Sequence, residues 1–405
     1  MTARTEICRN TGGAFSVNAI FELSRQIRLH RCTGACFFHE SPPISNCLLT
    51  VQRHGNNKFV NLPNEYRKGL GLSNISTIAY GLRQADRSHR ADGASAVQGV
   101  VAGVDLGGTK VLAGLSDLQG QILATVEEPT EHGADAPVLT QIPRMVLSLL
   151  QRHRDQGPLR KTVVGIPSAV SPSTGLASLS PHLAIPADRP LAALLARNLP
   201  CPVVVENDVN LAAFAEATLG KGRNRDSLAF IAFGTGVGMG LVVGGALFRG
   251  CHGRAGELGL LPLGADPHQS APQARAGLFE DQVDSPAVRG LYGDGTVPVS
   301  EIFARAAVGE PDAVAVIETL AKSASLGIAS VQALFDPALI VLGGGIGSRP
   351  EFVEAATRHM SALLPFGAQI EATGIGPEAG MLGALMLGLS NLASLENSGQ
   401  QEVAR

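Results

Sequence analysis

The segment Glu206-Asn207-Asp208 places two carboxylates where a Val-rich run gives way to a helical pattern. At the end of a strand and facing a cleft, Asp208 has the chemistry of a general base that takes a proton from a substrate hydroxyl. Capping of the following helix by Asn207 or Asp208 is the alternative interpretation. Another carboxylate, Glu257, lies in the turn at residues 253–259, where it could accept hydrogen bonds from hydroxyl groups or remain an ordinary solvated side chain.

The motif DLGGTK lies between two predicted strands and has the composition of a phosphate-binding turn. Gly107 and Gly108 let backbone N–H groups approach a phosphate without an intervening Cβ. Asp105 could hold a magnesium ion through water, and Thr109 or Lys110 could donate to phosphate oxygens. A plain Gly-Gly hairpin turn is the alternative.

Two further glycine-rich turns follow predicted strands. The motif FGTGVGMG contains Gly234, Thr235 and Gly236 between two strands, and it lacks the Gly-Lys-Ser/Thr of a Walker loop. The run LIVLGGGIG at residues 339–347 is a buried strand that ends in a triple glycine around Gly344. Such an ending suits a flat adenine or ribose against bare backbone, and a strand-to-helix turn is equally natural. Three such turns at three strand ends are harder to explain as plain turns than any one of them alone.

Taken together, these segments resemble the ROK family (repressors, open reading frames and sugar kinases). DLGGTK, ENDVN, FGTGVGMG, GRAGELG, LIVLGGGIG and PEAGMLGALMLG occur in the family's order and spacing over about residues 98–392. The resemblance implies an α/β fold of the actin-like/sugar-kinase type, with two RNase H-like lobes and ATP and a sugar in the cleft between them. It implies that Asp208 is the catalytic base, that Asn207, Glu257 and Glu280 hold sugar hydroxyls, and that both glycine motifs contact phosphates.

The sequence departs from the family pattern on the sugar side. Family members usually read GELGH, whose His binds zinc and sugar, but Leu260 stands at that position. The family's Cys-rich zinc loop is matched by residues 266–280, which contain no Cys and retain only the tail of that loop at residues 277–280, where Glu280 matches the family's last sugar-contacting Glu. Because a structural zinc site needs thiolate and imidazole ligands, we expect no zinc. Ser168 and His182 also replace a usual Gly and Asn, which leaves the identity of the sugar open.

The elements that must position these residues form a regular pattern after residue 98. Strands are expected at residues 100–104, 111–116, 162–166, 203–206, 228–233, 240–243 and 339–342. Helices are expected at residues 137–152, 190–198, 209–219, 299–306, 311–335 and 350–364. A strand–strand–helix–strand–helix order that occurs twice indicates two similar α/β halves. We therefore expect lobes at residues 98–215 and 216–392, with the last helix packing back on the first lobe, and a polar tail at 393–405.

The composition excludes several classes of protein. Of the 405 residues, 45% are hydrophobic, 17% are charged and 48 are glycine, which is typical of an α/β protein with many tight turns. Six Cys are too few for a disulfide scaffold, and the first residues show no apolar signal region. The long uncharged run at 227–248 contains six glycines, which predicts two strands rather than a membrane helix. A cytoplasmic protein without a membrane partner is expected.

Residues 1–97 form a basic head of different character. Residues 1–100 hold 12 Lys and Arg against 6 Asp and Glu, which favours contact with nucleic-acid phosphates; a solvated basic surface is the alternative. Residues 17–29 resemble the first helix of a ROK repressor head and residues 76–82 its closing wing strand. The part between residues 34 and 68 does not match a recognition helix, so the head is either a diverged winged helix-turn-helix or a degenerate segment.

Three functions fit these patterns. The first is a sugar-responsive transcriptional regulator of carbohydrate metabolism, a homodimer in which sugar binding in the cleft biases a DNA-binding head. The second is an ATP-dependent kinase for a hexose such as glucose or for an N-acetylated aminosugar, with Asp208 as base and Mg-ATP as phosphoryl donor. The third is a sugar-binding relic with neither activity. The basic head and the altered sugar side favour the regulator, whereas the intact nucleotide motifs support the kinase.

Overall fold

The computed structural model describes residues 50–54, 57–61, 98–178, 186 and 188–403. The chain divides into two compact units, residues 1–94 and residues 95–405. In the first unit, β1 (Thr50–His54) and β2 (Asn57–Asn61) pair as an antiparallel hairpin. The predicted head helix and wing strand lie outside the described residues.

The second unit begins with a five-stranded sheet in the order β5-β4-β3-β6-β9. Its strands are β3 (Val100–Leu106), β4 (Lys110–Asp117), β5 (Ile122–Pro129), β6 (Leu159–Ile166) and β9 (Val203–Asn207). The first three strands form an antiparallel meander, and β6 and β9 then run parallel to β3. Helices α5 (Val138–Arg152) and α6 (Leu191–Leu195) pack on this sheet, and α15 (Ala379–Val403) also packs against β3, β4 and β6. Coverage by helices explains why β3 and β6 read as nearly continuous apolar runs.

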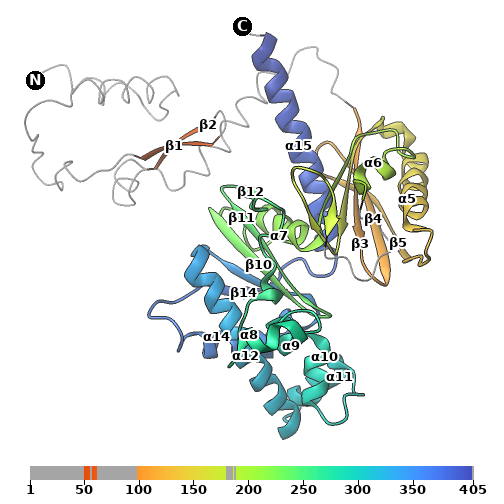
Figure 1. The fold of residues 1–405 in the computed structure, drawn as a ribbon. Coiled ribbons are helices and arrows are strands. Elements are labelled where there is room, and N and C mark those ends of the chain that lie inside the picture. The colour runs from red at the N-terminus through yellow and green to blue at the C-terminus, as the bar shows by residue number, and fades with distance from the viewer. Residues whose placement is uncertain (1–49, 55–56, 62–97, 179–185, 187, 404–405) are drawn as a thin grey trace, which may run out of the picture. The chain divides into compact units, whose positions relative to one another are not determined.

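A second sheet repeats this topology in the order β12-β11-β10-β13-β14. Its strands are β10 (Ser227–Phe233), β11 (Val237–Val243), β12 (Ala246–Leu247), β13 (Ile340–Gly343) and β14 (Ile370–Ala372). Again a three-stranded antiparallel meander is followed by two parallel strands. Helices α12 (Pro311–Phe335) and α14 (Pro350–Met360) share one apolar core with this sheet, and α7 (Asp208–Thr218) packs against β10 and β11 (Figure 1). The expected pair of similar α/β halves is therefore present.

The remaining described elements are short connecting segments and a group of short helices that precede α12. They are η2 (Arg154–Gln156), β7 (Ala169–Val170), β8 (Ala177–Ser178), η3 (Leu258–Leu260), α8 (Pro267–Ser270), η4 (Ala271–Gln273), α9 (Glu280–Val283), α10 (Ser285–Leu291), α11 (Val299–Ala307) and α13 (Gly344–Gly347). Those that matter for function are the loop around η3 and the start of α9, which carry two of the predicted site carboxylates.

Helices α7 and α15 connect the two sheets. They pack against each other so closely that a Cβ at Gly383 would lie 1.8 Å from the main-chain oxygen of Leu211. One apolar cluster joins Val163 of the first sheet to α7, β10, β13 and α15. The glycines of the C-terminal motif therefore permit a helix crossing on which both sheets depend. The segment expected to be a polar tail is helical as far as Val403.

Several boundaries differ from expectation for local reasons. The unpredicted β5 is an edge strand of its sheet, and its residues alternate between exposed and partly buried and include two glutamates, so it lacks a strong apolar signal. Helix α6 is shorter than the predicted 190–198, and α14 ends before the predicted residue 364. Strand β11 begins three residues earlier than expected because its glycines weaken the strand pattern.

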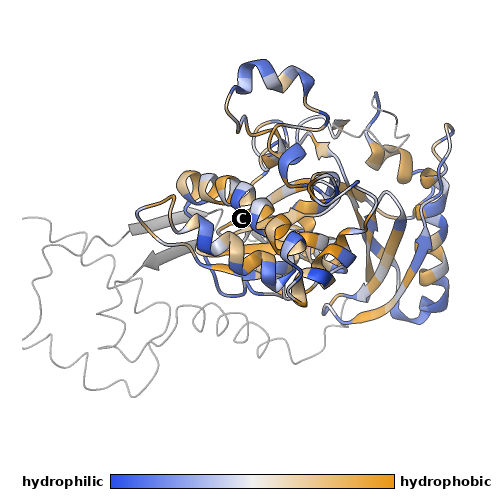
Figure 2. Cartoon of the chain, turned by 90° about the horizontal axis from the view of Figure 1, so that it is seen from below, coloured by the Kyte–Doolittle hydropathy of each residue, from blue (hydrophilic) through white to orange (hydrophobic). Residues whose placement is uncertain are grey.

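Apolar residues lie mainly along the strands and the buried faces of the helices, as Figure 2 shows for the second unit. Among the described residues, one helix, α12, is long and apolar enough to cross a membrane by length and composition alone. Of its most apolar window, 56% is buried inside the fold. Its buried side chains belong to the core shared with β10, β13 and α14, which is typical of a core helix.

Candidate active site

Asp208 is the first residue of α7, directly after the C-terminal end of β9. Asn207 is the N-cap of this helix: its Oδ1 accepts a hydrogen bond from the Asn210 N–H at 2.9 Å, and its Nδ2 donates to the Ser168 carbonyl oxygen at 3.3 Å. The capping interpretation therefore holds for Asn207. The Asp208 Oδ1 accepts from the Val209 N–H at 2.8 Å. Within the described part of the chain, the carboxylate of Asp208 receives no side-chain donor, and its other hydrogen bond comes from its own main-chain N–H.

Asp105 lies near the C-terminal end of β3, in the same sheet as β9. Because β3, β6 and β9 are parallel, their C-terminal ends meet at one edge of the sheet, which brings Asp105 and Asp208 within electrostatic reach. Burial raises the pKa of Asp105 to about 6, against the opposing effect of Lys110. Burial, followed by repulsion from Asp105, raises the pKa of Asp208 to about 7. A carboxylate with such a pKa is matched to proton abstraction near neutral pH.

The first glycine turn is the tip of the β3–β4 hairpin. The Gly107 N–H donates to the Lys110 carbonyl oxygen at 2.9 Å, and the Thr130 hydroxyl donates to the Gly107 carbonyl oxygen at 2.8 Å. A Cβ at Gly108 would meet nothing within 4 Å, so this position is open. Among the described residues, the N–H groups of Gly108 and Thr109 have no acceptor. Two backbone donors are therefore available to an incoming anion.

Lys110 is held by the neighbouring strand. Its Nζ lies 2.7 Å from the Glu127 Oε2 on β5, and both side chains are about half exposed. Such an exposed pair contributes little to stability, so the ammonium group can exchange partners at low cost.

The second and third glycine turns pack against each other. The Gly234 N–H donates to the Gly236 carbonyl oxygen at 3.0 Å, while no described residue accepts from the N–H groups of Thr235 and Gly236. Gly344 has φ of +80°, and a Cβ there would lie 2.3 Å from the Phe233 carbonyl oxygen. Only glycine therefore allows the third turn to pack behind the second. Free N–H groups and bare backbone are the features that a nucleotide's phosphates and base require.

Glu257 and Glu280 lie close enough to affect each other. Burial, followed by repulsion from Glu280, raises the pKa of Glu257. The Glu280 Oε2 accepts a hydrogen bond from the Val237 N–H at 3.1 Å, and a Cβ at Gly236 would lie 2.9 Å from the Glu280 Oε1. Glu280 therefore also supports the second glycine turn, a role that the sequence does not indicate. Burial raises its pKa as well.

One residue at this site was not predicted. A Cβ at Gly380 would lie 2.5 Å from the Asp105 Oδ2, so the first turn of α15 leaves room for this carboxylate only because residue 380 is glycine. The signal was present in the sequence, because Gly380 belongs to the C-terminal motif PEAGMLGALMLG. Its function could not be inferred without knowing that α15 returns to β3.

The donor groups fit magnesium better than zinc. Leu260, at the position of the family's zinc ligand, is 53% exposed and offers no donor atom. In the part of the chain that the structure describes, no group of three or more His, Cys, Asp or Glu residues is placed to hold a metal. Magnesium is commonly held by one or two carboxylates together with substrate phosphates and water, a role that Asp105 can fill.

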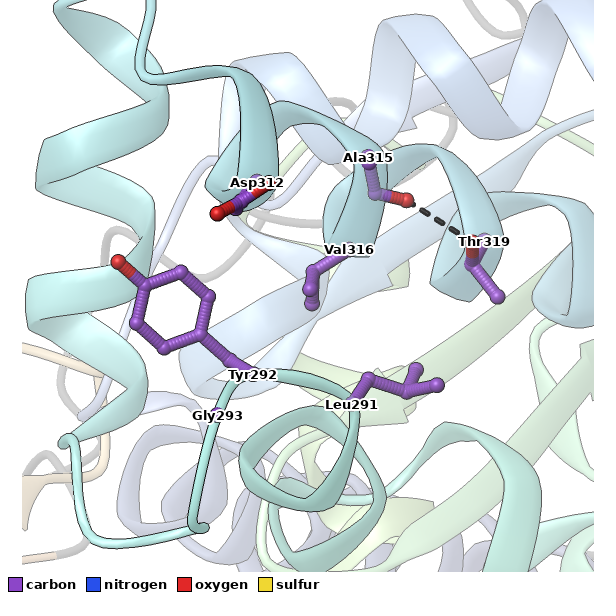
Figure 3. A pocket seen from close by; sticks show the side chains of 7 residues that line it. All are labelled: Leu291, Tyr292, Gly293, Asp312, Ala315, Val316 and Thr319. Atoms are coloured by element: carbon purple, nitrogen blue, oxygen red, sulfur yellow. Dashed lines mark hydrogen bonds between the residues drawn. The ribbon is translucent and has the colours of Figure 1, made fainter.

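A cavity of about 470 Å³ lies elsewhere, between the end of α10 and the first turns of α12. Leu291, Tyr292 and Val316 are among the residues that line it, as Figure 3 shows. The Arg305 guanidinium donates to the Tyr292 hydroxyl, which itself donates to the Glu310 carboxylate. None of the predicted site residues lines this cavity.

Two repeated α/β sheets, with acidic residues and glycine hairpins at their strand ends, define an actin-like two-lobed protein of the sugar-kinase type. The chain belongs to the ROK family, whose model matches residues 101–390. An N-acetyl-D-glucosamine kinase from Yersinia pseudotuberculosis serotype O:1b is 30% identical over 71% of this chain and 98% of its own length.

Solved structures agree with this assignment. A ROK family glucokinase from Streptomyces griseus, in complex with glucose and AMPPNP, is 27% identical, with a TM-score of 0.59 over 71% of this chain and 99% of that chain. A ROK family transcriptional regulator, a homologue of the E. coli MLC protein, is 23% identical, with a TM-score of 0.62 over 72% of this chain and 78% of that chain. At this lower identity, the second likeness concerns the fold alone.

Proposed function

We propose that this protein is an ATP-dependent sugar kinase in which Asp208 is the general base. The observation that carries the proposal is the environment of Asp208. This residue begins a helix at a strand end, no side chain of the described residues donates to its carboxylate, and burial beside Asp105 raises its pKa to about 7. Asn207 already caps this helix, so capping alone does not account for a second buried acid at the next position.

In the proposed reaction, Asp208 accepts the proton of a sugar hydroxyl as the hydroxyl oxygen attacks phosphorus. Asn207, Glu257 and Glu280 orient the sugar through hydrogen bonds to its other hydroxyls. The raised pKa of Asp208 makes it a stronger base than an ordinary carboxylate, while about half of it stays ionised near neutral pH.

The unpartnered N–H groups of the two glycine hairpins would hold the phosphates. These donors belong to Gly108, Thr109, Thr235 and Gly236, and the bare backbone at Gly344 would lie against the base or ribose. Asp105 would hold magnesium through water. When bound, Mg-ATP supplies the phosphoryl group and the positive charge that offsets the transferred oxygens.

The proposed substrates are glucose-like hexoses and N-acetylated aminosugars, because relatives of both kinds match nearly their full length to this chain. A cytoplasmic location and a homodimer belong to the same proposal. The exposed Leu260 adds an apolar group where other family members carry His, which favours a sugar with fewer polar contacts at that point.

A sugar-responsive regulator is the second candidate, and residues 1–100 favour it. Their balance of 12 basic against 6 acidic residues suits contact with DNA phosphates. The match to the N-acetyl-D-glucosamine kinase covers 98% of that kinase but only 71% of this chain. The basic segment is therefore additional to the kinase core.

Product analysis separates the two candidates. The full chain would be incubated with Mg-ATP and a panel of hexoses and N-acetylated aminosugars, and sugar phosphate would be detected by mass spectrometry. A phosphorylated sugar supports the kinase. Sugar binding by calorimetry without any product, combined with DNA binding that responds to the same sugar, would favour the regulator.

A further inference from the structure

Glu206 is a buried acid that takes no part in the proposed reaction. It is only 4% exposed, yet it lies in β9 just before the cap of α7. Its Oε1 accepts from the Asn207 N–H at 3.0 Å and from the Asn210 Nδ2 at 2.9 Å. Both donors belong to the cap and first turn of the helix that starts at Asp208. Through these two hydrogen bonds, the buried Glu206 stabilises the first turn of α7.

The cation that compensates this buried carboxylate comes from the other half of the molecule. The Arg249 Nε lies 2.5 Å from the Glu206 Oε2, and Arg249 follows β12 of the second sheet. The side chain of Arg249 is 33% exposed, whereas that of Glu206 is 5% exposed. Removing the guanidinium group would therefore leave an uncompensated charge in the interior.

Arg249 is also attached to the loop that carries Glu257. Its carbonyl oxygen accepts from the Ala255 N–H at 3.2 Å, which closes the loop from residue 249 to residue 255. The next residue, Gly256, accepts from the Met239 N–H of β11 at 3.0 Å. The side chain of Arg249 thus binds Glu206, which stabilises the helix turn that begins at Asp208. Its main chain holds the loop that carries Glu257, a residue predicted to bind the sugar.

We infer that the Glu206–Arg249 pair is a positioning link that sets the placement of Glu257 relative to Asp208, and so determines which sugar hydroxyl meets the base. The inference rests on the proposed function. Neither residue need touch the substrate. We expect loss of the link to misplace the sugar and to leave nucleotide binding intact. In the described part of the chain, no hydrogen bond joins the pair to the glycine turns that would hold the nucleotide.

Two substitutions test the link with limited disturbance. Arg249→Lys keeps the positive charge but loses the planar Nε donor. Glu206→Gln keeps an acceptor for Asn207 and Asn210 but loses the ion pair. Arg358→Gln is the matched control, because it removes a guanidinium from an exposed pair with Glu318 on α12 and α14.

The measurement is calorimetric titration of each full-length variant with D-glucose, with N-acetyl-D-glucosamine and, separately, with AMPPNP, with steady-state kinetics alongside. We expect both single variants to lose at least about tenfold in sugar affinity or in kcat/KM for the sugar, while AMPPNP affinity stays within about twofold. The double variant should be no worse than the more damaged single variant, because both break one link. Arg358→Gln should behave as wild type.

Wild-type sugar affinity in both variants would overturn the inference. An equal loss of sugar and AMPPNP affinity, or additive losses in the double variant, would do so as well, because either result indicates general damage or independent roles. If the wild type binds sugar without turnover, the kinase proposal fails. The sugar affinities of wild type and variants, measured by calorimetry, then still test the positioning link.

Discussion

Replacing Asp208 by Asn should stabilise the folded protein while removing its proposed activity. Asn has nearly the same shape, and its Oδ1 can still accept from the Val209 N–H, so packing is retained. The carboxylate, in contrast, becomes charged in a buried setting beside Asp105, which is why its pKa is raised to about 7 and why it is fully ionised only above neutral pH. Removing that charge removes an unfavourable electrostatic contribution to the free energy of the folded state.

The magnitude follows from linkage. A pKa raised from the ordinary 3.8 of an aspartate to about 7 corresponds to about 4 kcal/mol at about 1.36 kcal/mol for each pKa unit. Asp208 retains some solvent exposure, so we expect about 2–4 kcal/mol. Between the two pKa values the folded state binds more protons than the unfolded state, so the stability contributed by this group falls as pH rises from about 4 to about 7.

The assay is urea denaturation of full-length wild type and Asp208→Asn at about pH 8 and at about pH 4.5, where the advantage of the variant should shrink to about 1 kcal/mol or less. A gain of equal size at both pH values would indicate a packing effect and refute the electrostatic reasoning. A less stable variant at the higher pH would refute it as well.

Three further outcomes follow from the same geometry. Gly344→Ala should destabilise the protein by about 2–4 kcal/mol, because of the positive φ and the contact of 2.3 Å with a main-chain oxygen, whereas Gly345→Ala, which would meet nothing within 4 Å, should be nearly neutral in thermal melting. Equal effects of the two substitutions would contradict this account of the turn. Lys110→Gln should change stability by less than about 1 kcal/mol but raise the KM for ATP about tenfold, while Glu127→Gln should leave that KM within about twofold. An unchanged KM for ATP in Lys110→Gln would show that Lys110 does not bind the phosphates of ATP. Dialysis against a zinc chelator should leave the melting temperature and sugar affinity unchanged, since Leu260 offers no ligand atom, and a drop in melting temperature reversed by zinc would contradict that expectation.

The sequence predicted the central strands well because they are buried on both faces. The apolar runs of β3 and β6 and the long periodic helix α12 carry a strong apolar signal, and the repeated order of elements indicated two similar halves. The edge strand β5 was missed because one side of it faces solvent and its residues alternate in exposure.

The sequence named candidate site residues one by one but not the contacts between them. Spacing and motifs indicated Asp105 and Asp208, yet only the return of α15 reveals that Gly380 makes room for Asp105. The second contact of Glu280, with the glycine turn, and the pairing of Arg249 with Glu206 depend on tertiary structure between distant segments. Local sequence patterns carry no information about such pairings.

The most direct test of the proposed function is ADP release by the full-length protein with Mg-ATP, with and without D-glucose or N-acetyl-D-glucosamine. Wild type, Asp208→Asn and the control Arg358→Gln would be compared. We predict sugar-dependent release by wild type and the control, and a loss of at least about a hundredfold in Asp208→Asn. Sugar binding without sugar-dependent ADP release, or release that persists in Asp208→Asn, would contradict the assignment of this protein as a sugar kinase with Asp208 as its base.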